Sequence, residues 1–165
     1  MIGAVTTAYK MLSKHGFADI MQNSHTGEKS LHTNVFFDAD ELIRGFASEK
    51  ILEVPNYLTV QTGENKHITL QPDFLQYINH SCNPNVFFDT TRMELIALKE
   101  IQPGDELFFF YPSTEWKMDR PFECFCGTPQ CLHRIQGAAF LSEQEAGRYR
   151  LTDFIIQKLQ TSKTK

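Results

Sequence analysis

The chain has 165 residues, of which 41% are hydrophobic and 22% are charged, and its formal net charge is −4. This length suits one ordinary domain, and this composition excludes intrinsic disorder. The acidic balance argues against binding of bare nucleic acid, which requires a basic surface to displace counterions from phosphates. A protein or peptide segment is therefore the better candidate partner.

Membrane association is also not expected from the sequence. The first 15 residues lack the continuous apolar stretch of a secretory signal, and nowhere do about 18 apolar residues run together. An intracellular, cytoplasmic location is predicted, with the nucleus as the alternative.

Residues 1–29 carry weak hydrophobic periodicity and end in a polar stretch, which indicates a loosely held N-terminal extension with one strand. A body of short strands is predicted in residues 30–112. Turn-rich tips separate several of them and favour hairpins. The fourteen Phe residues fall largely in clusters, as is typical of buried strands. The fold class is predicted to be mostly β (α+β), with strands at 33–37, 57–61, 67–70, 86–89, 93–98 and 107–111.

Residues 113–141 form a loop segment rich in Pro and Cys that needs a staple to become ordered. Residues 142–165 are predicted to form a C-terminal helix and tail. Ser142 and Glu145 match a capping box at the helix start. One helical face then carries four apolar residues, Leu151, Phe154, Ile155 and Leu159. This face is expected to pack on the core, and partner binding is the alternative.

The four cysteines suggest a metal site. Cys124, Cys126 and Cys131 have the spacing C-x-C-x4-C in a loop, and Cys82 stands alone upstream. Four thiolates complete the tetrahedral coordination of zinc and leave no position for a reacting water, so one structural zinc ion is predicted. Unligated or partly oxidised cysteines are the alternative, and His80 and His133 are spare ligands.

Three motifs, in the same order along the chain, resemble those of SET-domain protein-lysine methyltransferases. The segment Asn79-His80-Ser81-Cys82-Asn83-Pro84-Asn85 is similar to the N-H-S-C-x-P-N motif of that family. Residues 104–111, GDELFFFY, are similar to its G-E-E-L-x-F-x-Y motif, and the cysteine pattern is similar to its post-SET segment. The resemblance covers roughly residues 30–141.

The resemblance implies a fold and a division of the chain. It implies a SET domain in residues 30–112 with the β-clip fold, in which the two central motifs form a pseudoknot, followed by a post-SET zinc-binding segment in residues 113–141. It also implies that Cys82 joins Cys124, Cys126 and Cys131 on the zinc ion, in agreement with the number of thiols.

The resemblance further implies an activity, the transfer of methyl groups from S-adenosyl-L-methionine to the ε-amine of a protein lysine, with histones as one possible target. Tyr111 takes the catalytic position and also contacts the cofactor. The remaining cofactor residues are Asn79, His80, Phe122, which is expected to stack on the adenine, and Tyr57, for which a core position is the alternative. Phe109 and Phe110 line the substrate channel, and Phe109 favours di- or trimethylation. A nearby sulfonium and aromatic walls favour the neutral amine, so no acid–base pair is required.

Two departures from the family pattern keep a second function open. Neither Ser13–Phe17 nor Lys29–His32 supplies both glycines of the G-x-G cofactor segment, and Phe110 replaces a more polar residue. A non-catalytic SET-like module that binds a peptide or protein is therefore the main alternative. Two weaker alternatives are a zinc-ribbon nucleic-acid binder, which the acidic balance opposes, and a thiol hydrolase using Cys82 and His80, which zinc ligation opposes.

Overall fold

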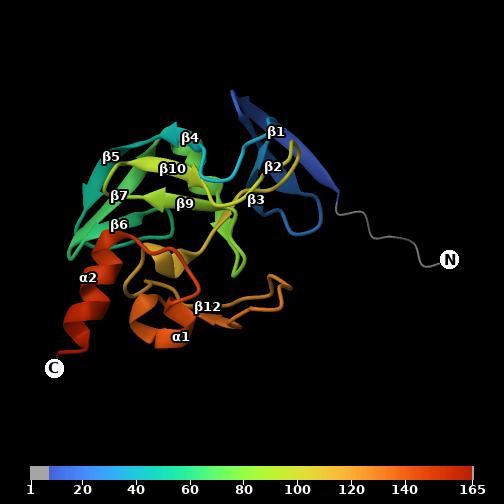
Figure 1. The fold of residues 1–165 in the computed structure, drawn as a ribbon. Coiled ribbons are helices and arrows are strands. Elements are labelled where there is room, and N and C mark those ends of the chain that lie inside the picture. The colour runs from blue at the N-terminus through green and yellow to red at the C-terminus, as the bar shows by residue number, and fades with distance from the viewer. Residues whose placement is uncertain (1–7, 165) are drawn as a thin grey trace.

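The structure is a computed structural model that describes residues 8–164 (Figure 1), and it is mostly β as predicted. Three sheets have three strands each. They are β1 (Tyr9–His15), β2 (Ala18–Asn23) and β3 (Lys29–Thr33); β4 (Leu42–Gly45), β10 (Glu94–Ala97) and β9 (Val86–Asp89); and β5 (Ala47–Leu52), β7 (Lys66–Gln71) and β6 (Val60–Gly63).

Two short strand pairs and a few helical segments complete the fold. The pairs are β8 (Asn79–His80) with β11 (Phe108–Phe109), and β12 (Phe122–Glu123) with β13 (Arg134–Ile135). The α-helices are α1 (Glu143–Ala146) and α2 (Asp153–Ser162), and the 3-10 helices are η1 (Asp73–Tyr77), η2 (Tyr111–Ser113) and η3 (Ala138–Phe140). Figure 1 shows the β1–β3 sheet on the side of the molecule opposite α2. None of the helices within residues 8–164 has the length and apolarity needed to cross a lipid bilayer.

The expectation of a loose extension with one strand before residue 30 was wrong for the described residues. β1 and β2 form an antiparallel hairpin, and β2 pairs in turn with β3. Alternation along β2 buries Ala18 and Ile20, and Leu31 of β3 is fully buried beside them. Because these side chains join the main core, the sheet is held by the same hydrophobic burial as the rest of the fold.

The strand expected at 33–37 is also not formed. β3 ends at Thr33, whose hydroxyl donates a hydrogen bond to the Val35 carbonyl at 2.7 Å, and Asn34 N donates to the Phe17 carbonyl at 2.8 Å. These local hydrogen bonds turn the chain away from an extended path. Only Phe37 pairs again, as an isolated bridge with Ile101. The two predicted hairpins, β6–β7 and β9–β10, are confirmed.

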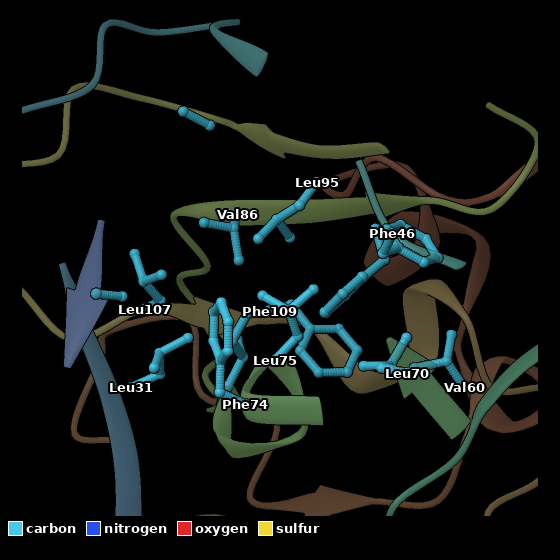
Figure 2. Close-up of a cluster of buried hydrophobic side chains, with 14 of the residues drawn as sticks. Leu31, Phe46, Val60, Leu70, Phe74, Leu75, Val86, Leu95, Leu107 and Phe109 are labelled. Carbon is cyan, nitrogen blue, oxygen red and sulfur yellow. The ribbon is translucent and has the colours of Figure 1, made fainter. Parts of the chain in front are cut away.

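The core joins the sheets around the central strand pair. Figure 2 shows Phe109 of β11 between Leu31 and Leu107 on one side and Leu70 and Val60 on the other. All of these belong to one buried hydrophobic cluster. Side chains of β3, β6 and β7 therefore fix the position of β11, the strand that leads to Tyr111.

The two family-like motifs lie side by side. β8 and β11 pair in parallel, with Asn79 opposite Phe108 and His80 opposite Phe109. Ser81 N then donates to the Phe109 carbonyl at 3.2 Å. The predicted strand 107–111 is only partly formed, since the chain enters η2 at Tyr111. This pairing brings the N-H-S-C segment next to the predicted catalytic tyrosine.

The C-terminal segment holds two helices rather than one. The capping box is confirmed, because the Ser142 hydroxyl accepts from Glu145 N and Ser142 N donates to the Glu145 carboxylate. α1 nevertheless ends at Ala146, and the Thr152 hydroxyl caps a new helix by accepting from Ile155 N at 3.4 Å. Leu151 thus lies before α2 and not on its face. The packed face of α2 carries Ile155, which is fully buried, with Phe154 and Leu159 partly covered beside it.

Gly137 is expected to be indispensable for docking the cysteine-bearing segment. Its φ is +114°, and a Cβ there would lie 2.5 Å from the Trp116 carbonyl oxygen. Gly137→Ala should lower the free energy of unfolding by more than about 2 kcal/mol, because it adds backbone strain to a backbone clash. Urea denaturation of this variant beside Gly63→Ala, whose Cβ would meet only Lys66 Cβ at 3.5 Å, measures the difference. Equal stability of the two variants would contradict this account.

Candidate functional site

A cleft of about 900 Å³ lies beside the paired strands β8 and β11. Its walls include several separate stretches of the chain: the turn into β3, the loop between β5 and β6, the η1 helix, the β8–β11 pair with Tyr111, and the cysteine-bearing segment. Segments that are far apart in the sequence therefore meet at this cleft. It is the natural candidate for a ligand site, because ligand pockets are concave and largely apolar with a few polar groups.

Most of the predicted site residues line this cleft. They are Tyr57, Asn79, His80, Phe109, Tyr111, Phe122, Cys124 and Cys126. Tyr57 lies on the loop between β5 and β6 with 84% of its surface exposed, so the alternative of a core position for it was wrong.

Phe110 does not line the cleft, so its expected place in the substrate channel was wrong. Successive residues of an extended chain point to opposite sides, so Phe109 and Phe110 cannot face the same space. Phe110 is 1% exposed and stacks on Tyr149 with ring centroids 3.6 Å apart and planes 8° from parallel. It instead packs the C-terminal segment against the central strands.

Tyr111 lies in an aromatic cluster at the cleft. Its ring centroid is 4.7 Å from that of Phe109, 5.2 Å from His80 and 5.9 Å from Phe122. Burial, with the nearby carboxylates of Glu115 and Glu106, raises the pKa of Tyr111 to about 12. The phenol is therefore neutral at ordinary pH and acts as a hydrogen-bond donor or acceptor in a largely apolar wall.

His80 connects Tyr111 to the cysteines. Its Nδ1 accepts a hydrogen bond from Tyr111 N at 3.2 Å, and its Nε2 lies 3.4 Å from Cys82 Sγ. Burial lowers the pKa of His80 to about 4, so the ring is neutral and carries its proton on Nε2. Nε2 therefore donates to the Cys82 sulfur, and His80 orients the tyrosine backbone rather than serving as an acid or base.

Asn79 is held so that its side-chain oxygen is free. Its Nδ2 donates to the Lys29 carbonyl at 2.9 Å and to Glu106 Oε1 at 3.3 Å. Both N–H groups of the amide are thus used, and within residues 8–164 no hydrogen bond is made to Oδ1. An acceptor in this position suits an ammonium group bound in the cleft.

Of the two segments compared with the family's G-x-G cofactor segment, only the second lies at the cleft. Residues 27–30 line it, next to Asn79, whereas Ser13–Phe17 form the end of β1 and the turn into β2 and do not line it. Gly27, with φ +76°, is the one glycine of the lining segment. The backbone carbonyl of Lys29, rather than a pair of glycines, supplies the contact to the Asn79 amide.

Two carboxylates in the cleft were missed by the sequence analysis. Burial raises the pKa of Glu106 to about 6 although the Asn79 amide donates to it, and burial raises the pKa of Glu115 to about 7 although Thr114 and Gln61 donate to it. Glu106 could have been noticed inside the G-D-E-L motif. Glu115 follows Tyr111 in an irregular segment without periodicity, and nothing in its neighbours marks it.

Glu115→Gln should therefore stabilise the protein at neutral and alkaline pH. An unfolded Glu ionises near pH 4.5, whereas folded Glu115 ionises near 7, so the stability that its protonated form provides is complete below pH 4.5 and is lost as the pH rises to about 7. Glutamine cannot ionise and escapes this loss. Thermal or urea unfolding should show the variant more stable by about 3 kcal/mol at pH 8 and equal at pH 4. A variant less stable at both pH values would contradict this prediction.

The four cysteine sulfurs form one cluster. All Sγ atoms lie within 4.8 Å of one another, and those of Cys82 and Cys124 are 4.0 Å apart. Four thiolates around one zinc ion at about 2.3 Å require sulfur separations of this size. His133, named as a spare ligand, is not part of the cluster, and its backbone carbonyl accepts from Cys124 N at 2.7 Å.

The surroundings of the cluster also suit a metal ion. Leu132 N donates to Cys82 Sγ at 3.4 Å, as does His80 Nε2. Such N–H groups stabilise the negative charge that thiolates bring to zinc. Burial raises the pKa of Cys82 and raises that of Cys124 to about 11, so metal binding must displace protons from these thiols. The donor set, its spacing and its hydrogen bonds all fit a closed zinc site.

Comparison with known proteins shows which family has this architecture. The sequence profile of the SET domain matches residues 8–112, well over half of the chain. This match begins 22 residues ahead of the boundary expected at residue 30 and includes all three strands of the β1–β3 sheet.

Three relatives illustrate the similarity. "Methyltransferase flvH" of Aspergillus flavus is 44% identical over 101 residues, which cover 60% of this chain and 56% of that protein. "Histone-lysine N-methyltransferase, H3 lysine-36 specific" is 34% identical over 87 residues in Aspergillus oryzae and 32% identical over 87 residues in Gibberella zeae. Each of these two matches covers 49% of this chain and 9% of the relative, so the chain spans only part of the length of each relative.

Proposed function

Because this chain belongs to the SET domain family, we propose that it transfers methyl groups from S-adenosylmethionine to the ε-amine of a protein lysine. The observation that supports this most is the meeting of Asn79, Tyr111 and the cysteine-bearing segment at one cleft. A cofactor bound there supplies an electrophilic methyl group on a sulfonium. The residues of the chain supply orientation, a water-poor channel and hydrogen bonds at the reacting atoms.

The roles of the residues follow from their positions. Asn79 Oδ1, free of other partners in residues 8–164, accepts from the cofactor's ammonium group, and the neutral His80 keeps Tyr111 in register. Phe122 stacks against the adenine from the cysteine-bearing wall. Tyr111 directs its hydroxyl to the transferring methyl, and Phe109 lines the channel without a hydroxyl that would hold a water. The products are therefore expected to include di- and trimethyl-lysine.

The cysteine cluster is proposed to hold one structural zinc ion. The ligands are Cys82, Cys124, Cys126 and Cys131, whose spacing supports a closed tetrahedral site. Two of these cysteines also line the cleft. Zinc therefore keeps the wall that carries Phe122 in place, and it takes no part in the chemistry.

The proposed substrate is a basic peptide segment, with histone H3 as the first candidate. The names of the Aspergillus oryzae and Gibberella zeae relatives support histone H3. Carboxylates outnumber cations along the cleft, where Glu28, Glu106, Glu115, Asp119 and Glu123 are opposed only by Lys29 and Arg120 among the described residues. A histone substrate would favour the nucleus over the cytoplasm.

Mass spectrometry of methylated products tests the proposed function. The zinc-loaded protein is incubated with S-adenosylmethionine and histone H3, histone octamers or a library of lysine peptides, and Tyr111→Phe is the control with strongly reduced activity. We expect the wild type to add mass to lysine in steps of about 14 Da, one step for each methyl group. Peptide binding without any methyl transfer would instead support the non-catalytic interaction module, which the packing of Phe110 away from the cleft no longer favours.

A further inference from the structure

Glu115 lies at the cleft with its carboxylate held in a fixed orientation. Its Oε2 accepts from Gln61 N at 2.9 Å and from the Thr114 hydroxyl at 2.6 Å. Gln61 is itself 5% exposed, and its side-chain Oε1 accepts from Trp116 N at 2.9 Å. This reciprocal pair of hydrogen bonds connects the start of β6 to the segment after η2, so the carboxylate is preorganised before any ligand enters.

The second carboxylate oxygen is free for a ligand. Within residues 8–164, Oε1 of Glu115 accepts no hydrogen bond, and Glu115 contributes to the lining of the cleft. The charge of Glu115 is also near enough to the Tyr111 phenol to contribute to the raised pKa of that group. A half-buried carboxylate with one unused oxygen therefore lies close to the predicted catalytic tyrosine.

The two cleft carboxylates lie in different surroundings. Glu106 Oε1 accepts from the Asn79 amide, and its other oxygen lies 3.9 Å from His32 Nε2, so it belongs to the wall proposed for the cofactor. Glu115 accepts instead from Gln61 N of β6, the strand that follows the loop carrying Tyr57. Tyr111 interacts electrostatically with both carboxylates. Glu115 is thus the carboxylate available to the methyl acceptor.

We infer that Glu115 accepts the proton of the substrate's ammonium group and holds the resulting amine beside Tyr111. This assignment rests on the proposed function, because it requires an amine as the methyl acceptor. A free lysine ε-ammonium has a pKa of about 10.4, so only about one in 2,500 is neutral at pH 7. Aromatic walls and a sulfonium favour the neutral form, and a local carboxylate gives the proton a destination inside the cleft.

The step balances with no further reactant. One ammonium proton moves to Glu115 Oε1, which leaves a neutral amine and a neutral carboxylic acid. The amine lone pair then forms the N–C bond as the C–S bond breaks, and the sulfur keeps that electron pair as a neutral thioether. Glu115 returns its proton to water after the product leaves. For each further methyl group on the same lysine, the proton on nitrogen leaves by the same route.

The pH dependence of kcat with Glu115→Gln tests this inference. Glutamine keeps the size of the side chain and an oxygen for Gln61 N and Thr114, but it cannot take a proton. At pH 7.5 kcat should fall about 100-fold, a typical effect of losing a general base. At pH 9.5 the deficit should shrink below about tenfold, because solvent then supplies more neutral amine. Glu100→Gln, which alters an exposed carboxylate outside the cleft, should match wild type at both pH values.

Chemical rescue gives a second readout. Glu115→Ala should regain at least about tenfold in kcat when formate is added at pH 7.5, since a small carboxylate can occupy the vacated space. Calorimetric titration of S-adenosylmethionine into each variant checks that the cofactor side is intact, and an affinity within about threefold of wild type is expected.

The outcomes separate the inference from the proposed function. If wild type methylates lysine but Glu115→Gln loses the same factor at both pH values and formate gives no rescue, Glu115 is only a structural residue and the inference fails alone. An undiminished kcat in Glu115→Gln also overturns the inference and leaves the proposed function standing. A wild-type protein that binds S-adenosylmethionine yet methylates no lysine overturns both proposals.

Discussion

Removing zinc is expected to abolish cofactor binding while leaving the main β core folded. In the proposed zinc site the thiolates tie Cys82, next to β8, to the segment 124–131, part of which lines the cleft. Without the metal, four thiols cannot hold this wall, and the contacts of Phe122 with Tyr111 and His80 are lost. The affinity for S-adenosylmethionine should fall at least about tenfold, equivalent to about 1.4 kcal/mol.

Calorimetry of chelator-treated protein, with Cys124→Ser beside it, measures this loss. Circular dichroism should show that most strand structure survives. Among the described residues, the main hydrophobic core contains no cysteine, and the buried cysteines belong to a separate small cluster. Adding zinc back should restore binding to the chelated wild type and not to the variant. Unchanged cofactor affinity in zinc-free protein would remove the structural role assigned to the metal.

Tyr111→Phe is expected to have the second large effect, on the chemical step rather than on binding. The variant loses only a hydroxyl, while the backbone hydrogen bond to His80 Nδ1 and the packing against Phe109 remain. Removing one positioned polar group next to the reacting atoms typically lowers kcat about 100-fold. The affinity for S-adenosylmethionine should stay within about threefold of wild type.

Single-turnover methyl transfer and calorimetry together check this separation. Tyr149→Phe is the matched control, because it also removes one hydroxyl, here one that donates to the Cys82 carbonyl at 2.7 Å and lies outside the cleft. It should lower stability by about 1 kcal/mol and leave kcat near that of wild type. If both variants have the same kcat, Tyr111 has no special place in the reaction.

Much of the site could be predicted because the sequence carries its chemistry in short local motifs. The cysteine spacing predicted a four-sulfur cluster from coordination chemistry alone, and the four Sγ atoms do lie together. That the segments around Asn79 and Tyr111 lie together was predicted only from the family resemblance. Nothing local to residues 79–80 specifies a parallel strand at 108–109, since such pairing depends on the whole chain.

The errors have physical causes that local patterns do not contain. Phe110 was assigned to the channel because it adjoins Phe109, although strand alternation turns it toward Tyr149. The β1–β3 sheet was missed because its strands carry few apolar residues and depend on Ala18, Ile20 and Leu31 reaching a distant core. Helix α2 begins at Asp153 because the side chain of Thr152 caps a new helix there, in place of a continuous helix from Ser142.

Glu115 shows most clearly what local sequence patterns cannot predict. Its chemistry arises from tertiary burial, from the hydrogen bond of Gln61 N and from the nearness of Tyr111, and these come from three separate parts of the fold. No spacing rule connects residue 61 with residue 115. Positions of this kind are visible only once the chain is folded.

Calorimetric titration of S-adenosylmethionine into the zinc-loaded protein tests the central claim most directly, with Asn79→Ala as the variant that alters the proposed cofactor contact. We expect one binding site per chain in the wild type and at least about tenfold weaker binding in Asn79→Ala, because the oriented amide is lost. Absence of binding to folded, zinc-loaded wild type, both alone and with a lysine peptide present, would contradict the assignment of this cleft to a methyltransferase.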